Sequence, residues 1–237
     1  MPEGHILEVL EVTKRFGGVT AVNHCSLAVQ PRKIYGLIGP NGSGKTTLFN
    51  CITGLERRDE GEIRFKDERI DGLKPHQVAC RGIGRTFQII RVFPELTALE
   101  NLLVVSRKGG LAGNRQRAME LLEFVKLDRL QNEYAGNLSY GQQKLLEFIR
   151  VLMTDPELIL LDEPAAGVNP TLLNDLLGAI RKLRVQGKTV LIVEHDMKVV
   201  MGLCETVFVL DYGEKIAEGP PEVIQADERV MEAYFGR

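Results

Sequence analysis

Short apolar runs separated by amphipathic segments dominate the second half of the chain. The runs at 158–161, 189–193 and 206–210 have the length of buried strands. The segments at 170–186 and 196–203 are interpreted as helices, the first with proline in its opening turn. Short buried strands that alternate with helices are typical of a parallel sheet covered on both faces. The pattern therefore predicts an α/β fold.

The first part of the chain has a different pattern. Apolar and polar residues alternate at 7–13, as in a half-buried strand, and 25–29 is interpreted as a second short strand. The segments 61–65 and 69–70 are interpreted as the two arms of a hairpin. These segments surround a further apolar run at 34–38. We therefore expect an antiparallel, β-rich section beside the parallel sheet.

The middle of the chain changes to helical character. Thr97 precedes apolar residues at helical spacing, and Glu100 stands three residues later, which is the pattern of a capping box. A turn at 109–114 is expected to separate this helix from a second one at 116–125. A third helix is expected at 142–153.

These expectations combine into one domain over residues 1–237. A helical subdomain at about 90–153 is inserted into a core that is formed by 1–89 and 154–237. No internal repeat or low-complexity segment interrupts this organisation.

Composition excludes several classes of protein. Apolar residues make up 44% and charged residues 26%, as in ordinary globular proteins, and a net charge of −2 gives no basic field to attract nucleic acid. Residues 1–10 carry Glu3 and Glu8 and do not match a signal peptide, and no apolar run approaches the ~18–20 residues of a membrane span. The cysteines form no C-x-x-C pair, which argues against structural zinc; they are Cys25, Cys51, Cys80 and Cys204.

The strongest motif is a glycine-rich loop between the apolar run at 34–38 and a helix-compatible run. It matches G-x-x-x-x-G-K-[ST], in which backbone N–H groups surround phosphate oxygens. Lys45 would reach the β- and γ-phosphates, and the hydroxyl of Thr46 would hold Mg²⁺. A glycine-rich turn without a ligand is the alternative, but the strand–loop–helix context argues against it. The candidate nucleotide-binding residues here are Gly39, Pro40, Asn41, Gly42, Ser43, Gly44, Lys45, Thr46 and Thr47.

Two carboxylates follow the apolar run at 158–161. Ligands of open α/β sheets bind at the carboxyl ends of the strands, where Asp162 and Glu163 would lie. Asp162 would support Mg²⁺ through its water shell, and Glu163 would act as the general base on the attacking water. Together with the phosphate-binding loop, this pair predicts hydrolysis of a nucleoside triphosphate.

The segment Leu138–Gln142 carries a family resemblance. Its sequence L-S-Y-G-Q resembles the L-S-G-G-Q signature of ABC-type ATPases, and the order of motifs resembles theirs over essentially the whole chain. The resemblance implies a P-loop NTPase core, ATP and Mg²⁺ as cofactors, and two cassettes that sandwich ATP head to tail. Ser139 and Gly141 would then contact the γ-phosphate bound by the other subunit, which is either an identical chain or a related one.

The resemblance also assigns roles to three further residues. Gln88 would touch Mg²⁺ or the attacking water, His195 would contact the γ-phosphate, and Phe16 would stack on adenine. Two positions depart from the family pattern, because Tyr140 replaces a glycine and Asn169 replaces an aspartate. The implied catalytic set is Lys45, Gln88, Glu163 and His195, and the implied metal ligands are Thr46, Gln88 and Asp162.

Three stretches resemble the ATPases of branched-chain (hydrophobic) amino-acid uptake systems: 84–88 with 91–93, 138–147 and 162–167. This resemblance implies an importer subunit at the cytoplasmic face of the membrane. Its partners would be permease subunits and a separate solute-binding protein, with no nucleic acid. The segment 106–116 is shorter than in many members of this group, so another small solute stays open as the cargo. Two different functions also stay open: a soluble ABC ATPase acting on DNA or ribosomes, and a scaffold that does not hydrolyse ATP.

Overall fold

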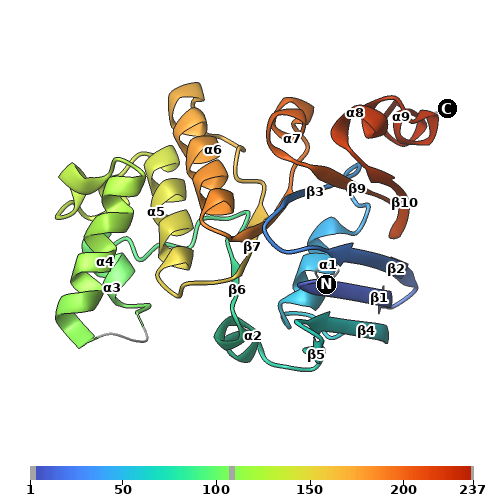
Figure 1. Cartoon of the computed structure of the whole chain (residues 1–237), viewed down its shortest axis with the longest axis horizontal. Coiled ribbons are helices and arrows are strands. Elements are labelled where there is room, and N and C mark those ends of the chain that lie inside the picture. The colour runs from blue at the N-terminus through green and yellow to red at the C-terminus, as the bar shows by residue number, and fades with distance from the viewer. Residues whose placement is uncertain (1–3, 107–109, 236–237) are drawn as a thin grey trace.

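The computed structural model describes residues 4–106 and 110–235, which form two sheets with helices around them (Figure 1). The larger sheet has the spatial order β10-β9-β3-β8-β7-β6. Its strands pair in parallel except for β10, which runs antiparallel to β9. The expected α/β class is therefore confirmed. The strands are β3 (Ile34–Ile38), β6 (Ile83–Arg85), β7 (Leu158–Asp162), β8 (Thr189–Val193), β9 (Thr206–Asp211) and β10 (Glu214–Gly219).

The smaller sheet is antiparallel, in the order β2-β1-β4-β5. Its strands are β1 (Leu7–Phe16), β2 (Val19–Val29), β4 (Glu60–Phe65) and β5 (Glu68–Arg69). Helix α1 (Lys45–Ile52) lies between this sheet and β3 (Figure 1), and Leu48 and Phe49 are fully buried in the shared core. The predicted antiparallel section is confirmed, although β1 and β2 are longer than the predicted strands.

The second core lies on the other face of the parallel sheet. It joins α6 (Pro170–Val185) and α7 (Met197–Leu203) to a helical group of α3 (Ala98–Leu103), α4 (Gly110–Phe124) and α5 (Tyr140–Leu152). Two 3₁₀ turns, Asp128–Leu130 and Ala135–Asn137, connect α4 to α5. Figure 1 shows the helical group at the opposite end of the molecule from β1 and β2. The helical character predicted for this part of the chain is confirmed.

The predicted turn at 109–114 is wrong for the residues that the structure describes. Helix α4 already begins at Gly110 and continues through Gly113, whereas Gly109 lies outside the described residues. A glycine inside a helix costs only about 1 kcal/mol relative to alanine. Burial of Ala118 and Leu122 on the same helix offsets that cost.

Five elements have no counterpart in the sequence prediction: β6, β10, α2 (Pro75–Arg81), α8 (Pro221–Gln225) and α9 (Glu228–Phe235). Strand β10 is an edge strand in which Ala217 is the one buried residue, so it has no apolar run to reveal it. Helices α8 and α9 follow β10 and cover that end of the sheet (Figure 1).

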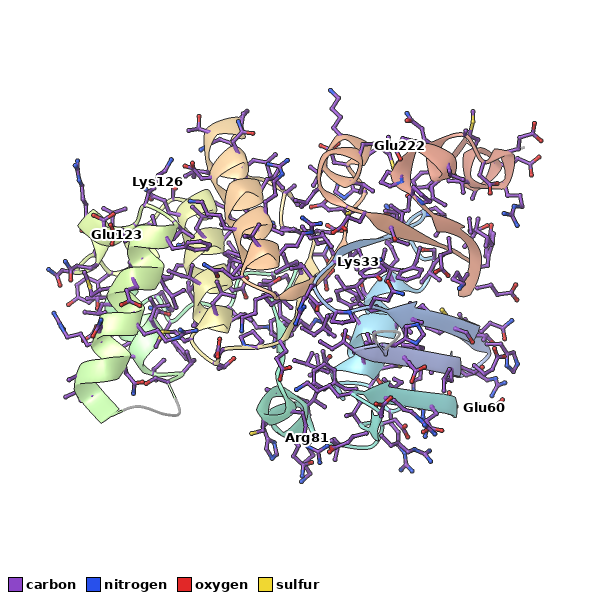
Figure 2. The ribbon with its side chains drawn as sticks, viewed as in Figure 1. Lys33, Glu60, Arg81, Glu123, Lys126 and Glu222 are labelled. Carbon is purple, nitrogen blue, oxygen red and sulfur yellow. The ribbon has the colours of Figure 1, made fainter. Side chains whose placement is uncertain are left out.

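Many charged side chains lie at the outside of the molecule, although Lys45, Lys144, Glu147, Asp162 and Glu194 are buried. Figure 2 shows Glu60, Lys126 and Glu222 at the periphery, each on a different element or loop. Within residues 4–106 and 110–235, no helix has both the length and the apolar character that a bilayer crossing requires.

Helix α3 is fixed to the preceding loop by a buried amide. Asn101 is fully buried; its Oδ1 accepts from the N–H of Phe93 at 2.8 Å. Its Nδ2 donates to the carbonyls of Phe93, Leu96 and Thr97 at 2.9–3.2 Å. Thr97 caps the same helix with Glu100, as predicted. Asn101 therefore binds several main-chain groups of the loop that leads into the helical group.

We predict that Asn101→Ala lowers the free energy of unfolding by about 2–4 kcal/mol, because several buried main-chain groups lose their partner. Urea unfolding followed by circular dichroism measures this change. Asn132→Ala, at an exposed position, is the matched control and should change stability little. Equal effects of the two substitutions would contradict the role given to Asn101.

Candidate active site

The phosphate-binding loop lies between β3 and α1, where two glycines allow its close approach to neighbouring strands. Gly39 has φ 148°, and a Cβ there would lie 2.0 Å from the carbonyl oxygen of Leu210 on β9. Gly44 has φ 98°, and a Cβ there would lie 2.2 Å from the carbonyl oxygen of Ala21 on β2. Because both positions exclude any side chain, the loop keeps its backbone available for phosphate oxygens.

Lys45 points back into its own loop. The side chain is 9% exposed, and Nζ donates to the carbonyls of Gly39 and Pro40, both at 2.8 Å, and to Ser43 Oγ at 3.2 Å. Burial lowers the pKa of Lys45, whereas the carboxylates of Glu163 and Asp162 act in the opposite direction. Its ammonium thus rests on neutral carbonyls that phosphate oxygens can replace.

Asp162 ends β7 in a buried ion pair. Arg85 Nη2 donates to its Oδ2 at 3.0 Å, and both side chains are nearly inaccessible. Burial raises the pKa of Asp162, and the Arg85 guanidinium opposes that shift. Arg85 Nη1 also donates to Asn50 of α1 and to Thr53, the residue that follows this helix, at 2.7 and 3.0 Å. Arg85 therefore ties the end of β7 to the helix that follows the phosphate-binding loop, and no sequence motif indicated it.

Glu163 lies at the centre of three converging loops. Gln88 Nε2, beyond β6, donates to its Oε2 at 3.1 Å, and His195 Nδ1, beyond β8, is 4.0 Å from its Oε1. The backbone of Glu163 has φ 47°, which is unusual for a residue with a side chain. The structure thus brings together three predicted catalytic residues whose strands pair side by side.

Ser139 and Gly141 occupy the start of α5. Ser139 is exposed and caps the helix: its Oγ accepts from the N–H of Gln142 at 3.4 Å, and its own N–H donates to Gln142 Oε1 at 2.9 Å. Gly141 is buried, and a Cβ there would lie 2.7 Å from Leu172 Cδ1 on α6. These two hydrogen bonds and the one from Gln143 N–H to the carbonyl of Ser139 stay within the helix, and none of them reaches the loop of Lys45. The exposed helix start is therefore open to a group from outside this site.

Tyr140, which departs from the family pattern, packs against the loop after β7. Gly167 has φ 72°, and a Cβ there would lie 2.8 Å from the Tyr140 ring. The aromatic ring and the glycine therefore fit each other. Asn169, the other departure, caps α6 by accepting from the N–H of Leu172 at 3.0 Å.

Phe16 lies at the end of β1, and its residue is 45% exposed. Lys14 Nζ lies 4.9 Å from the centre of its ring. The adjoining strand β2 reaches the phosphate-binding loop through the contact of Ala21 with Gly44. The ring is thus accessible for stacking at the end of the hairpin that borders the loop.

Tyr234 was missed by the sequence prediction. Its hydroxyl, on α9, accepts from the N–H of Gly39 at 2.8 Å, and burial raises its pKa. The two residues are 195 positions apart in the chain, and a tyrosine near the end of a short helix belongs to no motif. The C-terminal helix therefore contacts the first residue of the phosphate-binding loop.

The candidate metal ligands supply oxygen donors only. Thr46 contributes a hydroxyl, Gln88 an amide oxygen and Asp162 a carboxylate, and such a set suits Mg²⁺ when phosphates complete the coordination. Within the described residues, no group of three or more histidine, cysteine or acidic side chains could hold a metal without a further ligand. The residues present thus fit a cation that arrives with its nucleotide.

Two family models match the chain. One, described as ABC transporter, matches residues 22–166. The other, described as branched-chain amino acid ATP-binding cassette transporter, matches residues 214–237. The second match covers β10, α8 and α9, three of the elements that the hydrophobic pattern did not predict.

Curated relatives match over nearly their full length. The chain is 45% identical to the high-affinity branched-chain amino acid transport ATP-binding protein BraF of Pseudomonas aeruginosa, with 98% of each chain covered. It is 41% identical to LivG of Escherichia coli, which has the same description, again with 98% of each covered.

Solved structures agree with the fold. A nucleotide-free ATP-binding cassette from an ABC transporter superposes with a TM-score of 0.90 at 36% identity, covering 98% of this chain and all of that one. The ATP-binding cassette MJ0796, in a dimeric post-hydrolysis state with ADP and phosphate, gives 0.82 at 30% identity, covering 91% and 98%. The expected P-loop NTPase fold is confirmed.

We predict that Tyr234→Phe weakens ATP binding about 3- to 10-fold, because the Gly39 N–H loses its acceptor and the loop becomes less ordered. Titration with a fluorescent ATP analogue measures the affinity. Tyr134→Phe, at a tyrosine that is 56% exposed and lies between α4 and α5, is the matched control. Amide exchange at Gly39 should also accelerate only in the Tyr234 variant. Unchanged exchange and affinity would contradict the predicted contact.

Proposed function

Because this chain belongs to the ABC transporter family, we propose that it hydrolyses ATP to drive the import of branched-chain amino acids. The observation that carries the enzymatic part is the position of Glu163 between Gln88 and His195, next to the Lys45 loop. The C-terminal match to branched-chain amino acid cassettes and the descriptions of BraF and LivG support the cargo.

Each residue of the site would have a different role in hydrolysis. Lys45 would exchange its carbonyl partners for the β- and γ-phosphates. One carboxylate oxygen of Glu163 would accept the proton of the attacking water, while the Gln88 amide holds the other oxygen. His195, with an exposed imidazole beside Glu163, would contact the γ-phosphate. Mg²⁺, bound by Thr46 and Gln88 with Asp162 acting through water, would neutralise charge on the phosphates.

The exposed start of α5 supports a dimer. The exposed start of α5 offers the Ser139 hydroxyl and helix N–H groups to a phosphate bound by a second cassette. The dimeric MJ0796 cassette, at 30% identity, supports such a pairing. The partner is a second copy of this chain or a related ATPase subunit. Closure would complete both sites, and hydrolysis would release the pair.

An exposed apolar surface follows Gln88 in the chain. Ile89 is 80% exposed, Phe93 47% and Val104 56%, all at or near the junction with the helical group. Such side chains suit the docking of an apolar helix. We assign this surface to a cytoplasmic helix of a permease subunit, which would place the chain at the cytoplasmic face of the membrane. A separate solute-binding protein would complete the importer.

We predict that Glu163→Gln lowers the turnover number for ATP by about 10²-fold or more, because the amide cannot accept a proton, while ATP binding persists. Phosphate release measures turnover, and gel filtration with ATP should show a longer-lived dimer. Steady-state hydrolysis near that of the unmodified protein would exclude Glu163 as the base.

We also predict that Phe93→Asp abolishes stimulation of hydrolysis by the permease, because a carboxylate would have to be buried against the docking helix. Co-purification with the permease subunits measures assembly directly. The matched control is Val185→Asp, at an apolar residue that is 82% exposed on α6 and outside the proposed surface. Loss of assembly in both variants, or in neither, would contradict the assignment of the surface.

A further inference from the structure

Helix α5 carries a buried lysine whose bonds leave the helix. Lys144 is 7% exposed, and Nζ donates to the carbonyl of Glu163 and to that of Ala166, both at 2.7 Å. An ammonium that is removed from water must recover hydrogen bonds, so these two carbonyls compensate its burial. Burial lowers the pKa of Lys144, and nearby carboxylates oppose that shift. These carboxylates belong to Glu194, Glu147, Glu163 and Asp162.

The two carbonyls belong to the turn that presents Glu163. The N–H of Glu163 donates to the carbonyl of Val193 at 2.9 Å, and the carbonyl of Glu163 also accepts from the N–H of Ala166 at 3.2 Å. On the other side of the turn, Glu194 Oε1 accepts from the N–H of Ala165 at 2.8 Å. The left-handed backbone of Glu163 is thus held by groups outside the turn, and Lys144 is the one that α5 supplies.

Lys144 follows Ser139 and Gly141 by about one helical turn. Helix α5 therefore presents the exposed Ser139 at its start, and its buried Lys144 donates to the main chain of Glu163. A helix is stiff over this distance, so a displacement of its first turn carries Lys144 and the carbonyls bound to it. The contact of Lys144 with the two carbonyls thus connects the start of α5, which is proposed to meet a second cassette, to Glu163, the proposed general base of this chain's own site.

We propose that Lys144 is a positioning residue that holds Glu163 in its catalytic backbone conformation and couples it to the start of α5. The inference rests on the proposed role of Glu163 as the base. Lys144 itself touches no reacting atom. Its loss should therefore slow turnover without weakening ATP binding, because the phosphate-binding loop keeps its own contacts.

The test is the steady-state kinetics of Lys144→Met, which keeps the length of the side chain and removes its donors. The turnover number should fall about 10-fold or more, while ATP affinity stays within about 2-fold. Lys144→Arg restores a charged donor pair and should recover most of the loss. Lys126→Met, at a lysine whose side chain is 75% exposed, controls for the change in charge. Turnover equal to that of the unmodified protein, or a loss that Arg does not rescue, would overturn the proposal.

A double substitution separates this inference from the proposed function. If Lys144 acts through Glu163, Lys144→Met combined with Glu163→Gln is no slower than Glu163→Gln alone. Additive losses would overturn the role of Lys144 and leave Glu163 as the base. Normal turnover by Glu163→Gln would instead overturn the proposed function. Should Lys144→Met not fold, Lys144→Gln removes the charge and shortens the side chain, and it must also lower turnover at unchanged ATP affinity.

Discussion

Parallel pairing of buried strands is the constraint on which the rest of the structure depends. Strands β3, β8, β7 and β6 lie side by side and are fully or almost fully buried. Their main-chain N–H and carbonyl groups form hydrogen bonds with one another. Because the strands point the same way, the loops after them meet at one edge. Lys45, Gln88, Glu163 and His195 reach a common site for this reason, although they are far apart in the sequence.

Buried charges then fix the loops at that edge. Asp162 is paired with Arg85, and Glu194 accepts the N–H groups of the turn after β7 and of His195. Glu147 of α5 accepts the N–H of Arg91, in the loop that follows Gln88. Burial raises the pKa of both glutamates, and the main-chain donors act against that shift. Buried charged side chains thus hold the loops together by hydrogen bonds, as the ladder of main-chain hydrogen bonds holds the strands together.

The sequence predicted what depends on neighbours in the chain. The glycine-rich loop, the strand at 189–193 and the Thr97 capping box are local patterns, and the structure has each of them where expected. Arg85, Lys144 and Tyr234 act on groups that are distant in sequence, and none stands in a pattern that names its partner. The polar edge strand β10 was missed for a related reason, since its identity comes from pairing with β9 rather than from its own residues.

The fit of Tyr140 against Gly167 has an evolutionary consequence. With φ 72° and an aromatic ring 2.8 Å from where a Cβ would stand, a side chain at position 167 would need both a strained backbone and a displacement of the ring. A smaller residue at 140 would remove the steric part of that restriction. Replacement of the glycine is therefore easier in a chain whose residue 140 is small. In a chain that keeps the tyrosine, the shape of the loop after β7 stays coupled to the position of the aromatic ring.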